Sequence, residues 1–524
     1  MTTGRTRLHK DTYLDSVRLL AGSKAMLGVP GVEQATALMG TPANLAQLAS
    51  DGFDAGALTG AGANDLLLAV RAGSPEAAEA ALARAEQELL GGGPGDRPGD
   101  GGRAGPGPAT TAGPPRTLDE ALAALPGANV AVVSVPGPYA ALEAHKALSA
   151  GLHVLLFSDN VPVEDEVALK ARAGALGLLL MGPGAGTAML GGVGLGFANA
   201  VSRGPVGIVA AAGTGAQEAM SLLDRWGVGV AEVLGVGGRD LSRAVGGSMT
   251  MQAIGQLDRD PATRVILLVS KPPAADIAAK VLGMATTKPV VAALPGLREP
   301  VPLPPGVRVA GSLEQGALEV LEVLGRPRPE LGAGLVGAAR RACSRLAPER
   351  RAVRGLFSGG TLCFEALVLL SGRLGAVHSN TPLRDGWGLP APPGAHVCLD
   401  VGEEDYTRGR PHPMIDPETR TGLIRREGDD PSTAVVLLDV VLGHGAHPDP
   451  AAELLPACAG VLAQAGGPQV VVYVLGTGRD PQGDLAQRRA FEEAGCIVAP
   501  TGARAALVAA AIAARRPEIA GEPG

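Results

Sequence analysis

The stretch "GIVAAAGTGAQEAMSLL", Gly207–Leu223, holds the pattern that decides the fold. Its opening apolar run predicts a buried strand, and the pair Gly213 and Thr214 then opens a segment with helical spacing. The stretch "RGLFSGGTLCFEALVLL", Arg354–Leu370, makes the same turn with Gly360 and Thr361. One chain therefore carries this strand–turn–helix unit twice.

Two further matches follow the Gly-Thr pairs in the same order. "LGVGGRD" at Leu234–Asp240 is matched by "LDVGEED" at Leu399–Asp405, and "DRDPATRVILLV" at Asp258–Val269 by "GDDPSTAVVLLD" at Gly428–Asp439. The offset grows from 360 − 213 = 147 to 399 − 234 = 165 and 428 − 258 = 170. Three ordered matches indicate a duplicated α/β domain with small insertions in the second copy.

Upstream of the first copy, short apolar strands alternate with helical segments. The strands are "NVAVVSV", "HVLLFS" and "LLLMG", which begin at residues 129, 153 and 178. This alternation predicts a parallel, doubly wound sheet, in which ligands bind beyond the carboxyl ends of the strands. The cofactor-binding candidates at that edge are Pro136, Ser158, Asp159 and Asn160. The alternative is that they form ordinary turns between strand and helix.

The fold class we predict is α/β, with a small N-terminal domain, a Rossmann-like domain and two repeated flavodoxin-like domains. Residues 91–116 contain 16 glycines and prolines among 26 residues, which predicts a disordered linker. The expected divisions are a small α/β domain at 1–90, the linker at 91–116, the Rossmann-like domain at 117–202, the first flavodoxin-like domain at 203–325, a second linker at 326–350 and the second flavodoxin-like domain at 351–515.

Charge and cysteine usage exclude several classes of function. The formal net charge is −7, and no stripe of lysine and arginine marks a nucleic-acid-binding face. The five cysteines are scattered and never spaced as CxxC, which favours a reducing compartment without thiolate zinc sites. No apolar run is long enough to cross a membrane. We expect a cytoplasmic protein without nucleic-acid or membrane partners.

The two Gly-Thr turns predict anion binding. Backbone amides in the first turn of a helix are unpaired and carry the positive end of the helix dipole, so small residues there can cradle a phosphate or carboxylate. The alternative is helix capping, with Thr214 as N-cap, Gln217 completing a capping box and Glu218 complementing the dipole. Phe364 stands where the second copy would need Gln or Glu, so capping explains less there.

Polar loops in the second copy supply further candidates. His447 follows the apolar strand "AVVLLDVVL", and Arg408, Arg410 and His412 stand close together in "TRGRPHPMID". Two arginines beside a histidine can clamp a carboxylate or phosphate. The alternative is a loop held by surface hydrogen bonds. A metal site built from the two histidines with neighbouring aspartates lacks diagnostic spacing, so no tightly bound metal is predicted.

Several of these motifs resemble those of known protein families. "VPGPYAALEAHKALSAGLHVLLFSDNVP", "MGPGAGTA" and "GIVAAAGTGAQEA" resemble the α subunit of succinyl-CoA synthetases, and the second copy resembles the carboxy-terminal ligase domain of their β subunit. "VGGRDLSRAVGG", "VSKPP", "GRPHPMIDP" and "LLDVVLGHGAHPDP" are similar to the FdrA family of acyl-CoA-synthetase-like proteins. The chain thus resembles both halves of a ligase core fused together, and the resemblance implies that the Rossmann-like domain is of the CoA-binding type.

The resemblance implies roles for particular residues. Two facing helix starts would hold a phosphorylated histidine, with phosphate bound by Gly213, Thr214, Gly360 and Thr361, and with Glu218 and Glu365 orienting it. The chain departs from this pattern, because the segment after "KPVV" at 288–291 reads "AALPGLREPVPLPP" and contains no histidine. The glycine-rich CoA loop is also replaced by an unrelated N-terminal domain. The sequence therefore predicts no phosphohistidine, with CoA retained only as a possible cofactor.

Two classes of function follow. The first is an enzyme that transfers an activated acyl-type group through an acyl or carbamoyl phosphate, by electrostatic stabilisation of small carboxylate and phosphate substrates. The resemblance implies either a subunit of oxamate carbamoyltransferase in allantoin and purine catabolism, acting with companion subunits encoded nearby, or an ADP-forming acyl-CoA ligase. The missing histidine favours the carbamoyltransferase. The second class is a non-catalytic subunit that senses CoA or a nucleotide.

Overall fold

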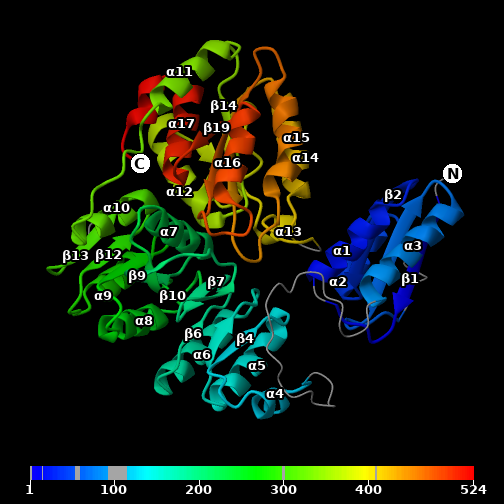
Figure 1. Ribbon diagram of the computed structural model, residues 1–524, viewed down its shortest axis with the longest axis horizontal. Helices are drawn as coiled ribbons and strands as arrows, with labels where there is room; N and C mark the ends of the chain where they lie inside the picture. The colour runs from blue at the N-terminus through cyan, green and yellow to red at the C-terminus, as the bar shows by residue number, and fades with distance from the viewer. Residues whose placement is uncertain (1–2, 15, 54–59, 92–114, 298–300, 408–409) are drawn as a thin grey trace. The chain divides into compact units, whose positions relative to one another are not determined.

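The computed structural model describes the chain except residues 1–2, 15, 54–59, 92–114, 298–300 and 408–409 (Figure 1). It divides into two compact units, the first comprising Met1–Pro114 with Glu404–Ile415 and the second Pro115–Glu403 with Asp416–Gly524. Within the described residues, no helix combines the length and apolar character needed to cross a lipid bilayer.

The first unit is a small α/β domain. Its three strands form an antiparallel sheet in the order β1-β3-β2, and the buried side of β3 packs on Ala78, Ala81 and Leu82 of α3. Ser74 caps α3 by accepting a hydrogen bond from the Ala77 amide. The elements are β1 Thr3–His9, α1 Ser16–Leu27, β2 Val32–Met39, α2 Pro42–Ser50, β3 Leu66–Ala72, α3 Pro75–Leu90 and, from the later segment, α13 Glu404–Thr407.

The second unit begins with the predicted Rossmann-like domain. Three parallel strands lie in the order β4-β5-β6, and a helix of 13 residues follows each of the first two, as the sequence predicted. The elements are α4 Leu118–Ala124, β4 Val130–Val133, α5 Gly137–Ser149, β5 His153–Leu156, α6 Val163–Ala175 and β6 Leu180–Met181.

The first repeated domain is a doubly wound sheet whose five parallel strands follow the order β13-β12-β11-β9-β10. The hairpin β7–β8, placed by the sequence in the preceding domain, instead extends this sheet, because β7 pairs antiparallel with β10. The elements are β7 Thr187–Leu190, β8 Val193–Gly196, β9 Arg203–Ala210, α7 Gly213–Arg225, β10 Val230–Gly235, α8 Ser248–Arg259, β11 Val265–Val269, α9 Ala275–Leu282, β12 Val290–Ala293, β13 Val307–Ala310 and α10 Leu313–Val323.

The second repeated domain has the same strand order, β16-β14-β17-β18-β19, with β15 added beside β16. The predicted duplication is therefore present in the topology. The segment 326–350, predicted as a linker, contains a helix, α11, that packs on α17. The elements are α11 Leu335–Arg345, β14 Ala352–Phe357, α12 Gly360–Leu374, β15 Val377–His378, β16 His396–Asp400, α14 Glu418–Asp429, β17 Thr433–Val441, α15 Pro450–Leu462, β18 Gln469–Leu475, α16 Asp484–Glu493, β19 Ile497–Ala499 and α17 Gly502–Ala514, before a final 3-10 turn at Pro517–Gly521.

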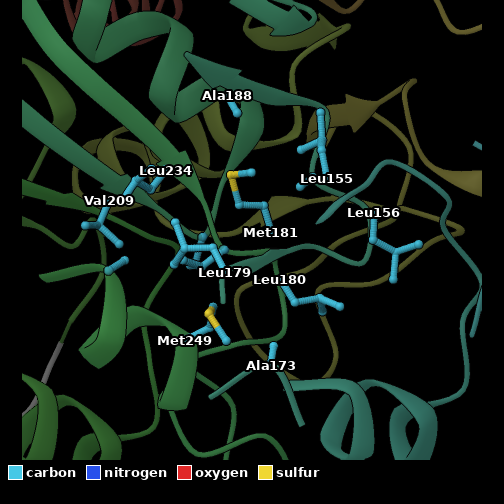
Figure 2. Close-up of a cluster of buried hydrophobic side chains, with 14 of the residues drawn as sticks. Leu155, Leu156, Ala173, Leu179, Leu180, Met181, Ala188, Val209, Leu234 and Met249 are labelled. Carbon is cyan, nitrogen blue, oxygen red and sulfur yellow. The ribbon is translucent and has the colours of Figure 1, made fainter. Parts of the chain in front are cut away.

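The Rossmann-like domain and the first repeated domain share one hydrophobic core. Figure 2 shows Leu155 and Met181 of the small sheet close to Ala188, Val209 and Leu234 of the larger one. A core that is continuous across both sheets fixes the two domains against each other. The α/β class and the parallel sheets predicted from the sequence are confirmed.

Candidate functional site

The starts of helices α7 and α12 meet at the centre of the second unit. Each helix follows the first parallel strand of its domain, β9 or β14, so the duplication brings two equivalent turns together. The backbone amide of Thr361 donates a hydrogen bond to the Thr214 hydroxyl at 3.2 Å. Both threonines are buried. The two predicted turns therefore form one contact.

Glycine makes this close approach possible. A Cβ atom added to Gly215 would lie 2.9 Å from the Thr361 methyl group, and one added to Gly359 would lie 2.9 Å from the Thr214 methyl group. Both distances are shorter than carbon atoms tolerate without a shift of the backbone. The small residues in both turns therefore serve helix–helix contact.

The capping alternative for the first turn is wrong. The N-cap of α7 is Ala212, which makes no side-chain capping bond. Thr214 lies inside the helix and accepts from the other domain, while the Gln217 side-chain amide donates to Asn199 at 3.2 Å. The polar residues of this turn are thus used in tertiary contacts.

An internal carboxylate occupies the turn before α12. Asp439, on β17, accepts hydrogen bonds from the amides of Ser358 and Gly359 at 2.7 and 2.8 Å. It also lies 3.1 Å from the buried guanidinium of Arg420. With the Thr361 amide bound to Thr214, one of the two predicted anion-binding residues of this turn, Gly360 and Thr361, has its amide engaged within the chain.

A second carboxylate lies against the first residue of α12. A Cβ atom on Gly360 would overlap Asp400 Oδ2, so only glycine admits this side chain. Asp400 ends β16, and burial raises its pKa to about 7, although the nearby Lys271 ammonium group opposes the rise. A carboxyl group that titrates near neutrality can accept or donate a proton under ordinary conditions.

Both carboxylates belong to the second copy alone. In the aligned repeats, Asp400 stands opposite Gly235 and Asp439 opposite Val269. The matched segments served only to indicate duplication, so neither aspartate was among the predicted site residues. The sequence did contain a signal for these two aspartates. Each stands at a strand end where the otherwise similar first copy has glycine or valine, and such a difference marks a position with a different role.

Glu218 and Glu365, predicted as catalytic, lie deep inside the interface between the two repeated domains. Glu365 accepts from the amide of Leu313, the first residue of α10, at 2.6 Å. Glu218 accepts from the hydroxyl of Tyr473 on β18. Each helix is thus tied to the opposite domain by its glutamate.

Burial governs the titration of both glutamates. Loss of solvent, together with the nearby Glu218 carboxyl, raises the pKa of Glu365 to about 8. The pKa of Glu218 is also raised by burial, against the opposing charge of Arg225. Two neighbouring buried carboxyls favour their protonated forms.

The predicted polar-loop residues belong to two different compact units. His447 is half-buried after β17, and its Nδ1 accepts from the Asp449 amide at 3.1 Å. Arg410 is exposed and His412 half-buried in the segment Glu404–Ile415, which belongs to the first unit. Arg408 lies outside the described residues. Among the side chains that are described, no cluster of three or more His, Cys, Asp or Glu could hold a metal ion.

The four predicted cofactor residues do lie together. The Ser158 hydroxyl donates to the Val135 carbonyl at 2.5 Å, which joins the ends of β4 and β5. Asp159 and Asn160 are exposed, and their carbonyl oxygens lie so close to Gly137 that a Cβ there would approach within 2.5 Å. The predicted carboxyl edge of this sheet therefore exists, with Pro136 just before α5.

Similarity to known proteins supports the assignment of these domains. The pattern of the CoA-ligase family matches residues 356–512. The α 2 subunit of the ADP-forming succinate–CoA ligase of Archaeoglobus fulgidus is 30% identical over 203 residues, which cover 37% of this chain and 68% of that protein. The chain belongs to the CoA-ligase superfamily.

Other matches extend over the rest of this CoA-ligase-superfamily protein. The uncharacterized protein YahF of Escherichia coli K12 is 38% identical over 512 residues, or 95% of this chain and 96% of YahF. The pattern of the AllF heavy metal-associated domain matches residues 1–102, a stretch without cysteine. Among solved structures, ATP citrate lyase from Methanothrix soehngenii is 23% identical with a TM-score of 0.31, covering 40% of this chain and 38% of that one.

Proposed function

We propose that this chain transfers an acyl or carbamoyl group directly from an acyl phosphate, without a phosphohistidine. The contact between the Thr361 amide and the Thr214 hydroxyl carries the proposal, because the two helix starts touch each other. This direct contact between the two turns supports a transfer that uses no phosphohistidine between them. The segment that follows β12 also contains no histidine.

The specific reaction we propose is carbamoyl transfer to oxamate, carried out with companion subunits. The AllF-type match of the N-terminal residues supports a place in allantoin catabolism, and the FdrA-like motifs agree with it. Oxamate and carbamoyl phosphate are small anions, which suits a site where Lys271 stands beside Asp400. The acceptor nitrogen of oxamate must lose a proton during the reaction.

Asp400 supplies the proton acceptor in this proposal. The acceptor nitrogen attacks the carbonyl carbon of carbamoyl phosphate, so a C–N bond forms while the bond from that carbon to the phosphate oxygen breaks. Phosphate leaves with the electron pair, and the nitrogen passes its proton to the Asp400 carboxylate. Its pKa of about 7 leaves a substantial fraction ionised at neutral pH. The Lys271 charge stabilises the anionic substrates.

CoA is a plausible ligand because of the superfamily. The residues at the predicted CoA edge suit this ligand only partly. Asp159 and Asn160 present exposed polar side chains, but the Ser158 hydroxyl is already used by the Val135 carbonyl. No cationic side chain is among the four candidates to meet the CoA phosphates. Pro136, Ser158, Asp159 and Asn160 would hold CoA if it binds, and no step of the proposed reaction depends on it.

An assay of the purified chain, alone and with the products of neighbouring genes, tests the proposal. We expect phosphate release from carbamoyl phosphate that requires oxamate. CoA-dependent ATP hydrolysis in the presence of a carboxylic acid would instead establish the second candidate, an ADP-forming acyl-CoA ligase, which the match to the succinate–CoA ligase subunit favours. Acid-labile phosphate on a histidine after incubation with labelled ATP would overturn the direct transfer. Ligand binding without turnover in either assay would indicate a sensing subunit.

A further inference from the structure

A groove of about 680 Å³ lies beside α12, between the two repeated domains. The loops that follow β11 and β12 form one wall, the outer face of α12 forms the floor, and the loop after β15 forms the other wall. Its lining includes Lys271, Leu297, Phe364, Val368, Arg384 and Trp387. None of the functional residues predicted from the sequence lines this groove.

The equivalent position beside α7 is filled by the chain itself. The segment Asn199–Ser202, which we call the plug, runs there without helix or strand structure. The Asn199 side chain donates to the Leu442 carbonyl at 3.0 Å, and the Ala200 carbonyl accepts from the Thr477 hydroxyl at 2.6 Å. From α7, Gln217 donates to Asn199, and Asp224 accepts from the Ser202 amide at 2.6 Å.

The duplication makes the two places comparable residue by residue. With the offset of 147, Phe364 corresponds to Gln217 and Ser371 to Asp224. Ala292 faces Leu268 in the first sheet as Val472 faces Leu438 in the second, so Leu297 corresponds to Thr477. The residues that hold the plug in one copy are thus the residues that line the open groove in the other.

The equivalent helix residues of the two copies also differ in how deeply they are buried. Gln217 and Ser221 of α7 are 1% and 0% exposed, and Gln217 contacts the plug through Asn199. Their counterparts Phe364 and Val368 are only half-buried. The second copy lacks the plug because the chain enters β14 by way of α11, which packs against α17 instead.

The chemistry of the groove differs from that of the plugged site. Gln217 and Thr477, which bind the plug, are replaced by Phe364 and Leu297, and the lining contains two cations, Lys271 and Arg384. Arg384 lies with its guanidinium carbon 5.0 Å from the centre of the Trp387 ring. No carboxylate is among the described residues that line the groove. Apolar walls with two convergent cations and a volume of this size are typical of a small-ligand site.

We infer that this groove binds a small organic anion that carries a flat apolar portion. The anionic group would lie between Lys271 and Arg384, and the apolar portion against Phe364, Val368 and Trp387. A polypeptide is disfavoured because Gln217 and Thr477, which bind the plug, correspond to the apolar residues Phe364 and Leu297 in this groove. The groove shares Lys271 with the Asp400 region, but its ligand class follows from its walls alone and does not depend on carbamoyl transfer.

Tryptophan fluorescence tests the inference on the full chain. The protein has two tryptophans, so the variant Trp226→Phe leaves Trp387 as the single reporter. We expect 8-anilinonaphthalene-1-sulfonate to quench Trp387 emission saturably, with energy transfer to the bound probe. Lys271→Met and Arg384→Gln, each in the Trp226→Phe background, should weaken its binding about tenfold, the effect of removing one hydrogen bond to a charged group.

Matched controls decide the outcome. Arg243→Gln removes an exposed cation that pairs with Asp276 and is not part of the groove lining, and binding should not change. The uncharged probe N-phenyl-1-naphthylamine should be insensitive to all three substitutions. Binding of the sulfonate that is unaffected by Lys271→Met and Arg384→Gln would overturn the site. Displacement of the probe by a heptapeptide with the sequence of residues 197–203 would instead identify a polypeptide-binding groove and contradict the small-ligand assignment.

Discussion

At the scale of single residues, the two copies of the repeated domain differ most in the acids at their strand ends. Asp400 and Asp439 replace Gly235 and Val269 and place two buried carboxyls at the start of α12. Asp439 is fully engaged with backbone amides and Arg420, which suits a structural role. Asp400 has a pKa near neutrality and a cation beside it, which suits proton transfer.

Asp400→Asn tests that role. As a proton acceptor, Asp400 must be ionised, so wild-type activity should rise with pH through about 7, where its carboxyl titrates. The asparagine variant should lose this dependence and be slower by a factor of about 100 or more, which is typical of general base catalysis. Rates of oxamate-dependent phosphate release across the range from acidic to mildly alkaline pH measure the effect. Asp429→Asn, at an exposed position on α14, is the matched control, and an equal loss there would contradict the assignment.

The raised pKa of Glu365 predicts that the free energy of unfolding depends on pH. Its pKa of about 8 in the folded protein exceeds the ordinary value of 4.5. Between these values the folded protein holds a proton that the unfolded chain has released. The free energy of unfolding therefore falls as pH rises from about 4.5 to 8, by at most about 1.4 kcal/mol per pH unit from this group.

The variant Glu365→Gln should flatten that decline. Denaturant unfolding at several pH values between the two pKa values measures the slope, and the difference between variant and wild type should grow in favour of the variant as pH rises. Glu493→Gln, at an exposed position on α16, should leave the slope unchanged. A wild-type slope retained in Glu365→Gln would show that Glu365 is ionised in the folded protein.

At the scale of helices and strands, the contact between α7 and α12 depends on which glycines face the partner helix. Gly215 and Gly213 share the first turn of α7 but differ in surroundings. An added Cβ on Gly215 would lie 2.8 Å from Val269 and 2.9 Å from Thr361, whereas one on Gly213 has no neighbour closer than 3.7 Å.

Gly215→Ala should therefore separate the helix starts and lower the free energy of unfolding by about 1 to 3 kcal/mol, the usual cost of overpacking. Gly213→Ala removes the same backbone freedom without a clash and should be neutral or slightly stabilising. Thermal and denaturant unfolding of the two variants provide the comparison. Equal losses of stability in both would mean that helix propensity, and not the interhelical contact, decides the effect.

Much of this arrangement could be predicted from the sequence because it repeats. Apolar runs alternating with helical spacing indicated the parallel sheets, and the ordered matches indicated the duplication. The hairpin β7–β8 was missed because its glycine-rich strands lack a periodic apolar pattern. Its pairing with β10 depends on tertiary contacts, which the pattern of a short segment does not reveal. Hydrophobic periodicity also does not indicate which side chain from elsewhere in the fold will bind the backbone amides at a helix start. The hydrogen bonds that Asp439 and Thr214 accept could therefore not be predicted.

At the scale of the whole molecule, the N-terminal unit has its own sheet and its own apolar clusters. Leu66, Leu68 and Val70 of β3 pack with α3, and a smaller cluster around Leu48 and Phe53 lies on the other side of the sheet. A domain with two covered sheet faces satisfies the requirement for independent folding.

We expect residues 1–90 expressed alone to fold cooperatively. Far-ultraviolet circular dichroism should show one sigmoidal thermal transition, and urea should unfold the fragment with a single midpoint. Leu68→Asp, which buries an unpaired charge in β3, provides a control that should abolish the transition. A fragment that melts without cooperativity, like this control, would contradict its independence.

The contact between Thr214 and Thr361 joins two domains of a single polypeptide. Joining the helix starts covalently makes their encounter intramolecular, so its strength is set by an effective concentration that dilution does not change. A site assembled from separate subunits loses occupancy as protein concentration falls, whereas this helix pair keeps its partner in every molecule. The stoichiometry of the two halves is fixed at synthesis. Mutations in either half can therefore be compensated only within the same chain.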